Sequence, residues 1–169
     1  MADQQSKPLV AIVMGSDSDF AVMQKAADIL IEFQIPYEMR ILSAHRVPNK
    51  LKEFVEKSES EGVKVFIAGA GLAAHLPGVI ASMTYLPVIG IPLLSGTLNG
   101  IDSLLSIVQM PGGIPVATVG IDNSKNAALL AVQILSTSNN ELADKLKLYR
   151  KKMADAVLKK DADLNKNIM

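Results

Sequence analysis

Side chains that could bind a charged ligand or move a proton gather in three short segments: MGSDSD, SAHRVP and AGAGLAAHLPG. Each segment directly follows an apolar run. The chain has only two histidines, His45 in the second segment and His75 in the third. An imidazole exchanges protons near neutral pH, so each histidine is a candidate general acid or base. The three segments together are therefore the candidate functional site.

The first segment, MGSDSD, has the features of an anion-binding turn. A glycine turn that opens a helix presents free backbone amides, and Ser16 and Ser18 add hydroxyl donors. Asp17 and Asp19 do not suit an anion, so at least one should face neutral hydroxyls, as in a ribose, or cap the helix. The simpler alternative, in which these residues only cap the first helix, is equally open, because the segment is neither a GxGxxG nor a GxxxxGK motif.

The second and third segments offer complementary chemistry. Arg46 can hold a phosphate through its bidentate fork, and His45 can transfer a proton. Taken alone, a surface His-Arg pair more often has no catalytic role. Gly69, Gly71 and Gly78 leave the backbone of the third segment bare, so a flat ring could approach closely. Tight helix–sheet packing is the alternative reason for these small residues.

Five apolar runs alternate with helical patterns, which predicts an α/β fold with a parallel, doubly wound sheet. The expected strands are 9–14, 37–42, 63–70, 88–94 and 115–120. The first helix should end near Phe33, and Pro48 suits the first turn of the second. Ligands of such sheets bind beyond the carboxyl ends of the strands, near the switch in strand order. The three candidate segments follow the first three strands and should meet at this edge.

Composition limits the classes of function. The net charge is zero and no apolar run reaches 18 residues, so we expect no nucleic-acid partner and no membrane span. The absence of cysteine excludes disulfides, thiolate metal sites and a cysteine nucleophile. The polar start, MADQQSKP, lacks the pattern of a signal peptide, which predicts a cytoplasmic protein. The length predicts one domain, 1–169, with its core at about 8–138.

Two features predict self-association. Between Val65 and Ile121 the only charged side chain is Asp102, which indicates buried strands and also subunit contacts. A long helix is expected at about 139–162, after a capping box from Ser138 to Glu141. One face of this helix carries an apolar stripe: Leu142, Leu146, Tyr149, Met153 and Val157. Its other face is basic, which favours a solvated surface over RNA or membrane binding.

Four segments in order resemble the phosphoribosylaminoimidazole carboxylase family of purine biosynthesis: GSDSD, SAHRVP, AGAGLAAHLPG and SLLSIVQMPGGIPVAT. They are similar to its class of 5-(carboxyamino)imidazole ribonucleotide mutases, and the likeness runs from about Val10 to Leu135. The segment GIDNSKNAALL is shorter than its counterpart in the family. The resemblance implies a three-layer α/β/α, flavodoxin-like fold, assembled as a homo-octamer with sites between subunits and without metal or cofactor.

The resemblance also implies roles for individual residues. His45 would be the general acid/base. The residues that would bind the ribonucleotide substrate are Ser16, Ser18, Asp19, Ser43, Arg46, Gly71 and His75. The implied reaction moves the carboxylate of 5-(carboxyamino)imidazole ribonucleotide from the exocyclic nitrogen to ring carbon 4, by decarboxylation and recarboxylation.

Other classes fit less well. A response-regulator receiver needs an aspartate at the end of the third strand, where this chain reads AGAGLAA. A flavodoxin-like electron carrier is disfavoured because the chain has no tryptophan and its tyrosines lie outside the three segments. The nearer alternative is the other class of the same family, which carboxylates aminoimidazole ribonucleotide directly with carbon dioxide. That class tends to read Ser-Ala-His-Lys, so Arg46 and His75 favour the mutase.

Overall fold

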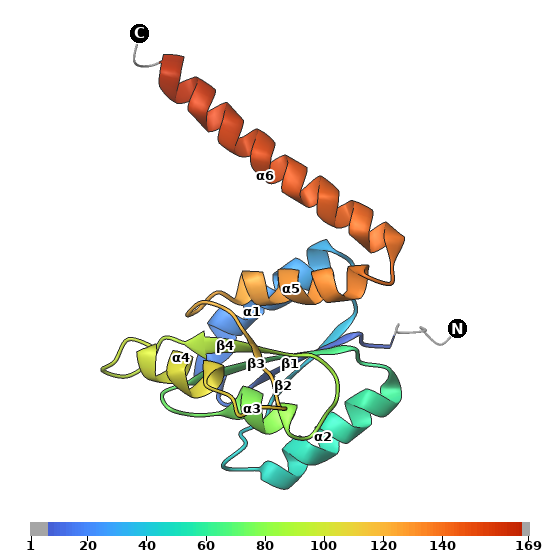
Figure 1. Ribbon diagram of the computed structural model, residues 1–169, viewed down its shortest axis with the longest axis vertical. Coiled ribbons are helices and arrows are strands. Elements are labelled where there is room, and N and C mark those ends of the chain that lie inside the picture. Colours follow the sequence, from blue (N-terminus) through green and yellow to red (C-terminus); the bar gives the residue numbers. More distant parts are fainter. Residues whose placement is uncertain (1–6, 167–169) are drawn as a thin grey trace. The chain divides into compact units, whose positions relative to one another are not determined.

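The computed structural model describes residues 7–166, which include a five-stranded, fully parallel sheet (Figure 1). Its strands are β1 (Val10–Met14), β2 (Tyr37–Ile41), β3 (Val65–Gly71), β4 (Val88–Leu93) and β5 (Ala117–Thr118). The spatial order is β2-β1-β3-β4-β5. The chain leaves β1 toward β2 on one side and returns to β3 on the other. The predicted five-stranded, flavodoxin-like fold is confirmed, and its switch point lies between β1 and β3.

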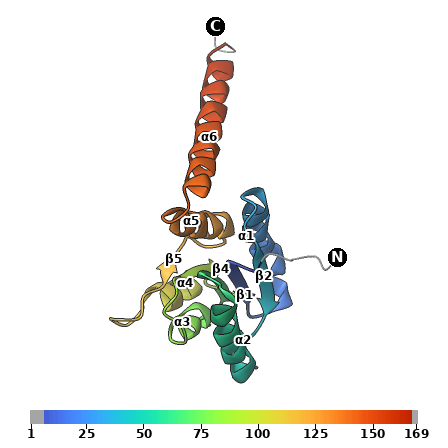
Figure 2. The same cartoon turned by 90° about the vertical axis from the view of Figure 1, so that its right-hand side faces the viewer.

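Helices follow each strand of the sheet. They are η1 (Asp17–Asp19), α1 (Phe20–Glu32), α2 (Pro48–Glu61), α3 (Leu76–Ala81), α4 (Ile101–Val108), α5 (Ser124–Ser136) and α6 (Asn140–Lys166). Helix α1 covers one face of the sheet, whereas α2, α3 and α4 cover the other (Figures 1 and 2). Pro48 is the first residue of α2, as predicted, because its ring fits the first helical turn.

Alternating side chains of the buried strands supply both faces of the sheet. Ala11 and Val13 of β1 face a core that also contains Leu51 and Val55 of α2. All residues of β1 are fully buried, as expected for a strand covered on both sides. The sheet therefore holds the loops at its carboxyl edge on a closely packed base.

The packing of α1 depends on a glycine of the central strand. A Cβ at Gly69 would overlap the thioether of Met23 and lie 3.2 Å from Leu93 Cδ1. Met23 is fully buried, so it has little free space in which to move. The glycine at position 69 is thus needed for helix–sheet packing. This was the alternative explanation for the small residues of the third segment.

The chain divides into two compact units, the first ending at Ala131 and the second beginning at Val132. The second unit contains the end of α5 and the 27-residue helix α6. The predicted capping box at Ser138 is wrong. Asn139 caps α6 instead, because it directly precedes the first helical residue and its Oδ1 accepts the Leu142 N–H at 3.0 Å.

The long helix predicted at about 139–162 is present as α6. Ion pairs join Glu141 to Lys145 and Asp144 to Lys147 along its first turns. Farther along, Met153 is 54% exposed. Among the described residues, none of the helices is long and apolar enough to cross a membrane.

Candidate active site

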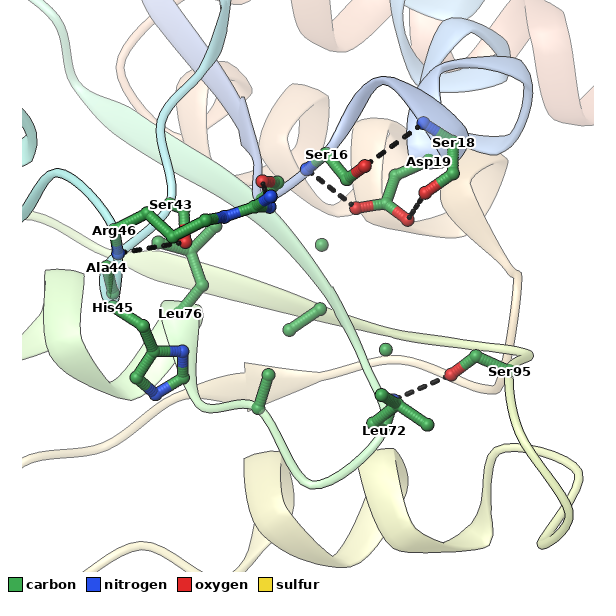
Figure 3. Close-up of a pocket in the computed structure, with 15 residues that line it drawn as sticks. Ser16, Ser18, Asp19, Ser43, Ala44, His45, Arg46, Leu72, Leu76 and Ser95 are labelled. Atoms are coloured by element: carbon green, nitrogen blue, oxygen red, sulfur yellow. Dashed lines mark hydrogen bonds between the residues drawn. The ribbon is translucent and has the colours of Figure 1, made fainter.

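A cavity of about 460 Å³ lies at the carboxyl ends of the first four strands (Figure 3). Its lining comes from the loops after β1, β2, β3 and β4, from the end of β3 and from the first residue of α3. The lining residues are Gly15, Ser16, Ser18, Asp19, Ser43, Ala44, His45, Arg46, Gly69, Ala70, Gly71, Leu72, Ala74, Leu76 and Ser95. Seven of the eight residues singled out from the sequence are in this set. The exception is His75.

The turn after β1 is held by its own polar side chains. Asp19 Oδ2 accepts the backbone N–H of Ser16 at 3.2 Å, and Ser16 Oγ accepts the Ser18 N–H at 3.4 Å. The Ser18 hydroxyl donates to Asp19 Oδ1 at 3.2 Å. Asp19 therefore caps this turn, one of the two roles expected for an aspartate here. Because each carboxylate oxygen has two lone pairs, Asp19 can still accept a ligand hydroxyl.

The loop after β2 brings the imidazole and the guanidinium to the cavity. The Arg46 backbone N–H donates to Ser43 Oγ at 3.3 Å, which closes the turn that carries His45. Arg46 Nη2 donates to the Gly15 carbonyl at 2.7 Å. Within residues 7–166, neither nitrogen of the His45 ring has a hydrogen-bond partner, and the side chain is exposed to the cavity. Its ring is thus accessible to a ligand in the cavity.

The end of β3 forms the bare floor of the cavity. Gly69, Ala70 and Gly71 project at most a methyl group there. A Cβ at Gly71 would lie 2.6 Å from Ser95 Oγ. That hydroxyl accepts the Leu72 backbone N–H at 2.6 Å. The missing Cβ therefore allows the loops after β3 and β4 to be joined.

His75 lies at the start of α3, outside the cavity lining. Its ring packs directly over Gly78, where a Cβ would overlap the imidazole. His75 Nδ1 is buried and has no hydrogen-bond partner among the residues that the structure describes. The glycine at 78 is thus explained by contact with this ring. A role of His75 toward the substrate stays a prediction.

Sequence reasoning missed the loop after β4. Ser95 lines the cavity, and Asp122 Oδ1, from the segment after β5, accepts the neighbouring Leu94 N–H at 2.8 Å. Ser95 follows the apolar run 88–94 just as the other candidates follow theirs, so its position was a usable signal. Asp122 accepts this hydrogen bond from a left-handed backbone conformation, with a φ of 54°. No sequence pattern indicated that conformation.

The described residues contain no cluster of three or more His, Cys, Asp or Glu side chains that could bind a metal ion. The groups available to a ligand in the cavity are instead a guanidinium, an imidazole, hydroxyls, a carboxylate and bare backbone. This set suits a phosphorylated, hydroxyl-bearing molecule with a flat ring.

Comparison with known proteins places these features in one family. A model of the family described as AIR carboxylase matches residues 9–156. The N5-carboxyaminoimidazole ribonucleotide mutase of Pyrococcus horikoshii is 60% identical over 157 residues, covering 93% of this chain and 89% of that protein. The mutase of the same name from Thermotoga maritima is 58% identical over 153 residues, covering 90% of each chain.

A solved structure gives the same result for the fold. The crystal structure of Treponema denticola PurE superposes with a TM-score of 0.86 at 35% sequence identity. The match covers 93% of this chain and 98% of that one. The similarity therefore extends over nearly the full length of both chains.

Proposed function

Because the chain belongs to the AIR carboxylase family, we propose that it is a mutase of purine biosynthesis. It converts 5-(carboxyamino)imidazole ribonucleotide to 4-carboxy-5-aminoimidazole ribonucleotide. One observation carries the proposal. A single cavity contains the turn after β1, the His45–Arg46 pair and the bare end of β3, in a chain 58–60% identical to proteins named as such mutases.

The loops after β1 and β2 would bind the phosphate and the ribose. Arg46 uses Nη2 to contact Gly15, and its guanidinium retains other N–H donors for phosphate oxygens. Ser16 and Ser43 supply hydroxyls beside it. Asp19 can accept a hydrogen bond from a ribose hydroxyl. These contacts fix the nucleotide, so that the ring reaches the floor at Gly71.

The chemistry requires one group that moves a proton. Protonation of the exocyclic nitrogen lets its bond to the carboxylate carbon break, and the bonding electrons stay on nitrogen as carbon dioxide leaves. Ring carbon 4 then attacks carbon dioxide and afterwards loses its hydrogen as a proton. One proton is taken up and one is released, so His45 can first donate and then accept it. Substrate and product are isomers, and neither an oxidant nor ATP is consumed.

The alternative is direct carboxylation of aminoimidazole ribonucleotide with carbon dioxide. Both reactions share the second half, in which carbon 4 attacks carbon dioxide. The mutase is favoured by Arg46 in the second segment and by the names of the relatives at the highest identities given above.

The test is to supply each candidate substrate separately, without ATP, and to measure initial rates. The mutase proposal expects faster turnover of the carboxyamino compound at low bicarbonate. Equal or faster turnover of aminoimidazole ribonucleotide with carbon dioxide would instead favour the alternative.

We also propose that the enzyme is a homo-octamer whose active sites lie between subunits. Helix α4 and the loop before it expose large apolar side chains in the single chain: Leu98 in the loop and Ile101, Leu105 and Val108 on the helix are each 47–58% exposed. Large exposed apolar patches usually mark contact sites, and these side chains lie in the segment that has Asp102 as its only charge. A closed symmetric assembly would cover such surfaces.

A further inference from the structure

Leu72 has an unusual backbone conformation for its residue type. Its φ is 54°, in the left-handed region that leucine rarely adopts. The conformation is unfavourable for an L-residue, because its Cβ comes too close to the following carbonyl oxygen. A glycine would adopt it without this cost. Leu72 is also 56% exposed, so core packing offsets little of the strain.

One hydrogen bond ties Leu72 to the loop after β4: its backbone N–H donates to Ser95 Oγ at 2.6 Å. Its side chain also lies next to Gly96 of that loop, because a Cβ added at Gly96 would overlap Leu72 Cδ2. The loop that carries Ser95 is itself held by Asp122, which accepts the Leu94 N–H. The backbone of Leu72 is thus bonded to the loop after β4, and its side chain lies beside that loop.

The Leu72 side chain lines the cavity. Leu72 and Leu76 are the only lining residues with large apolar side chains, and Leu76 is buried beneath the loops. In Figure 3, Leu72 and Ser95 lie across the bare floor from His45 and Arg46. Leu72 therefore presents a branched apolar group beside a floor that has almost no side chains.

We propose that Leu72 is the wall that retains carbon dioxide between the two bond changes, and that Ser95 is the positioning residue that holds it there. This inference rests on the proposed function. Carbon dioxide is small, apolar and neutral, so neither the guanidinium nor the carboxylate can hold it by charge. An apolar side chain that excludes water and narrows the exit would favour recapture by carbon 4 over escape.

The test measures recapture directly. The substrate carries ¹³C in its carboxylate and is converted in unlabelled bicarbonate buffer, and the fraction of product that retains ¹³C is measured by mass spectrometry. The parent protein should retain most of the label. In Leu72→Gly the ratio of recapture to escape should fall roughly tenfold. This equals a change of about 1.4 kcal/mol in the difference between the barrier to recapture by carbon 4 and the barrier to escape. Ser95→Ala should also lower the retention of ¹³C. Leu72→Met keeps a large apolar side chain, so its retention should stay close to that of the parent protein.

A matched control separates strain from function. Gln34 has a φ of 59° at the end of α1, outside the cavity lining. Leu72→Gly and Gln34→Gly both replace a left-handed residue by glycine, but only Leu72→Gly should lose label. Should Leu72→Gly fold poorly, Leu72→Ala decides, since it keeps the backbone constraint and removes the wall. Unchanged label retention in whichever folded variant is assayed would overturn the inference. If the parent protein makes no product from the carboxyamino substrate, the proposed function itself fails.

Discussion

Arg46 and Gly15 are 31 residues apart in sequence, and Arg46 Nη2 donates a 2.7 Å hydrogen bond to the Gly15 carbonyl. The bond joins the loops that follow two neighbouring strands. It also orients the guanidinium: because this group is planar and rigid, fixing one N–H restricts the directions in which its other N–H groups can point. The residue proposed to bind phosphate is therefore directed toward the cavity before any ligand arrives.

Arg46→Ala should weaken binding of the nucleotide far more than binding of the dephosphorylated riboside. Each hydrogen bond to a charged group contributes about 1.5–3 kcal/mol, so the affinity for the nucleotide should fall at least tenfold. Titration calorimetry with both ligands measures the difference. Arg40→Ala is the matched control, because Arg40 pairs with Glu38 and stacks over Phe54 outside the cavity. Equal losses for both ligands would show that Arg46 does not contact the phosphate.

His45→Asn should abolish turnover while the nucleotide still binds. Loss of a positioned proton-transfer group typically costs about 10²–10⁴-fold in rate. Within the described residues, no hydrogen bond ties the ring to the protein, so the substitution should leave the melting temperature nearly unchanged. Steady-state kinetics and calorimetry on one preparation test both parts. Turnover within a few-fold of the parent would remove His45 from the mechanism.

Gly78→Ala should destabilise the fold, because the new Cβ would overlap the His75 ring. Overpacking of this kind costs about 1–3 kcal/mol in the free energy of unfolding. Gly112→Ala is the control: no atom lies within 4 Å of its Cβ position and its φ is not left-handed. Urea denaturation of both variants gives the comparison, and equal midpoints would mean that the ring moves aside freely.

The assembly should sediment at about eight times the 18.1 kDa mass of the chain. Deletion of the residues after Ser138 should reduce or destroy it, with activity falling alongside. A finer test is Met153→Glu with Val157→Glu, which places charge on exposed apolar positions of α6. Lys151→Glu changes charge on another face of the same helix and should leave the mass unchanged. A fully active monomer at micromolar concentration would contradict both the octamer and the shared site.

The sequence predicted the sheet because its strands are short apolar runs that end in glycine or polar residues. β1 and β4 lie where the runs 9–14 and 88–94 indicated. β5 is only two residues long, although the run 115–120 suggested more. Hydrophobicity indicates which residues favour a strand, whereas the length of a ladder depends on how the neighbouring strand is placed.

The site was predictable where it depends on residue type and was missed where it depends on geometry. Ser16, His45 and Arg46 have side chains whose chemistry is evident from the sequence. The hydrogen bond from the Leu72 backbone N–H to the Ser95 hydroxyl joins residues 23 apart in sequence, and Leu72 has a left-handed backbone. Such a contact arises only once two loops are adjacent, so no local pattern indicates it.

The bare floor of the cavity has a consequence for drug resistance. Any side chain added at Gly69 or Gly71 would overlap Met23 or Ser95, so the floor tolerates little variation. An inhibitor that contacts this backbone alone would therefore leave the organism few escape mutations there. Resistance would have to arise at the rim, for example at Leu72, where the wall proposed above predicts that a change lowers the recapture of carbon dioxide.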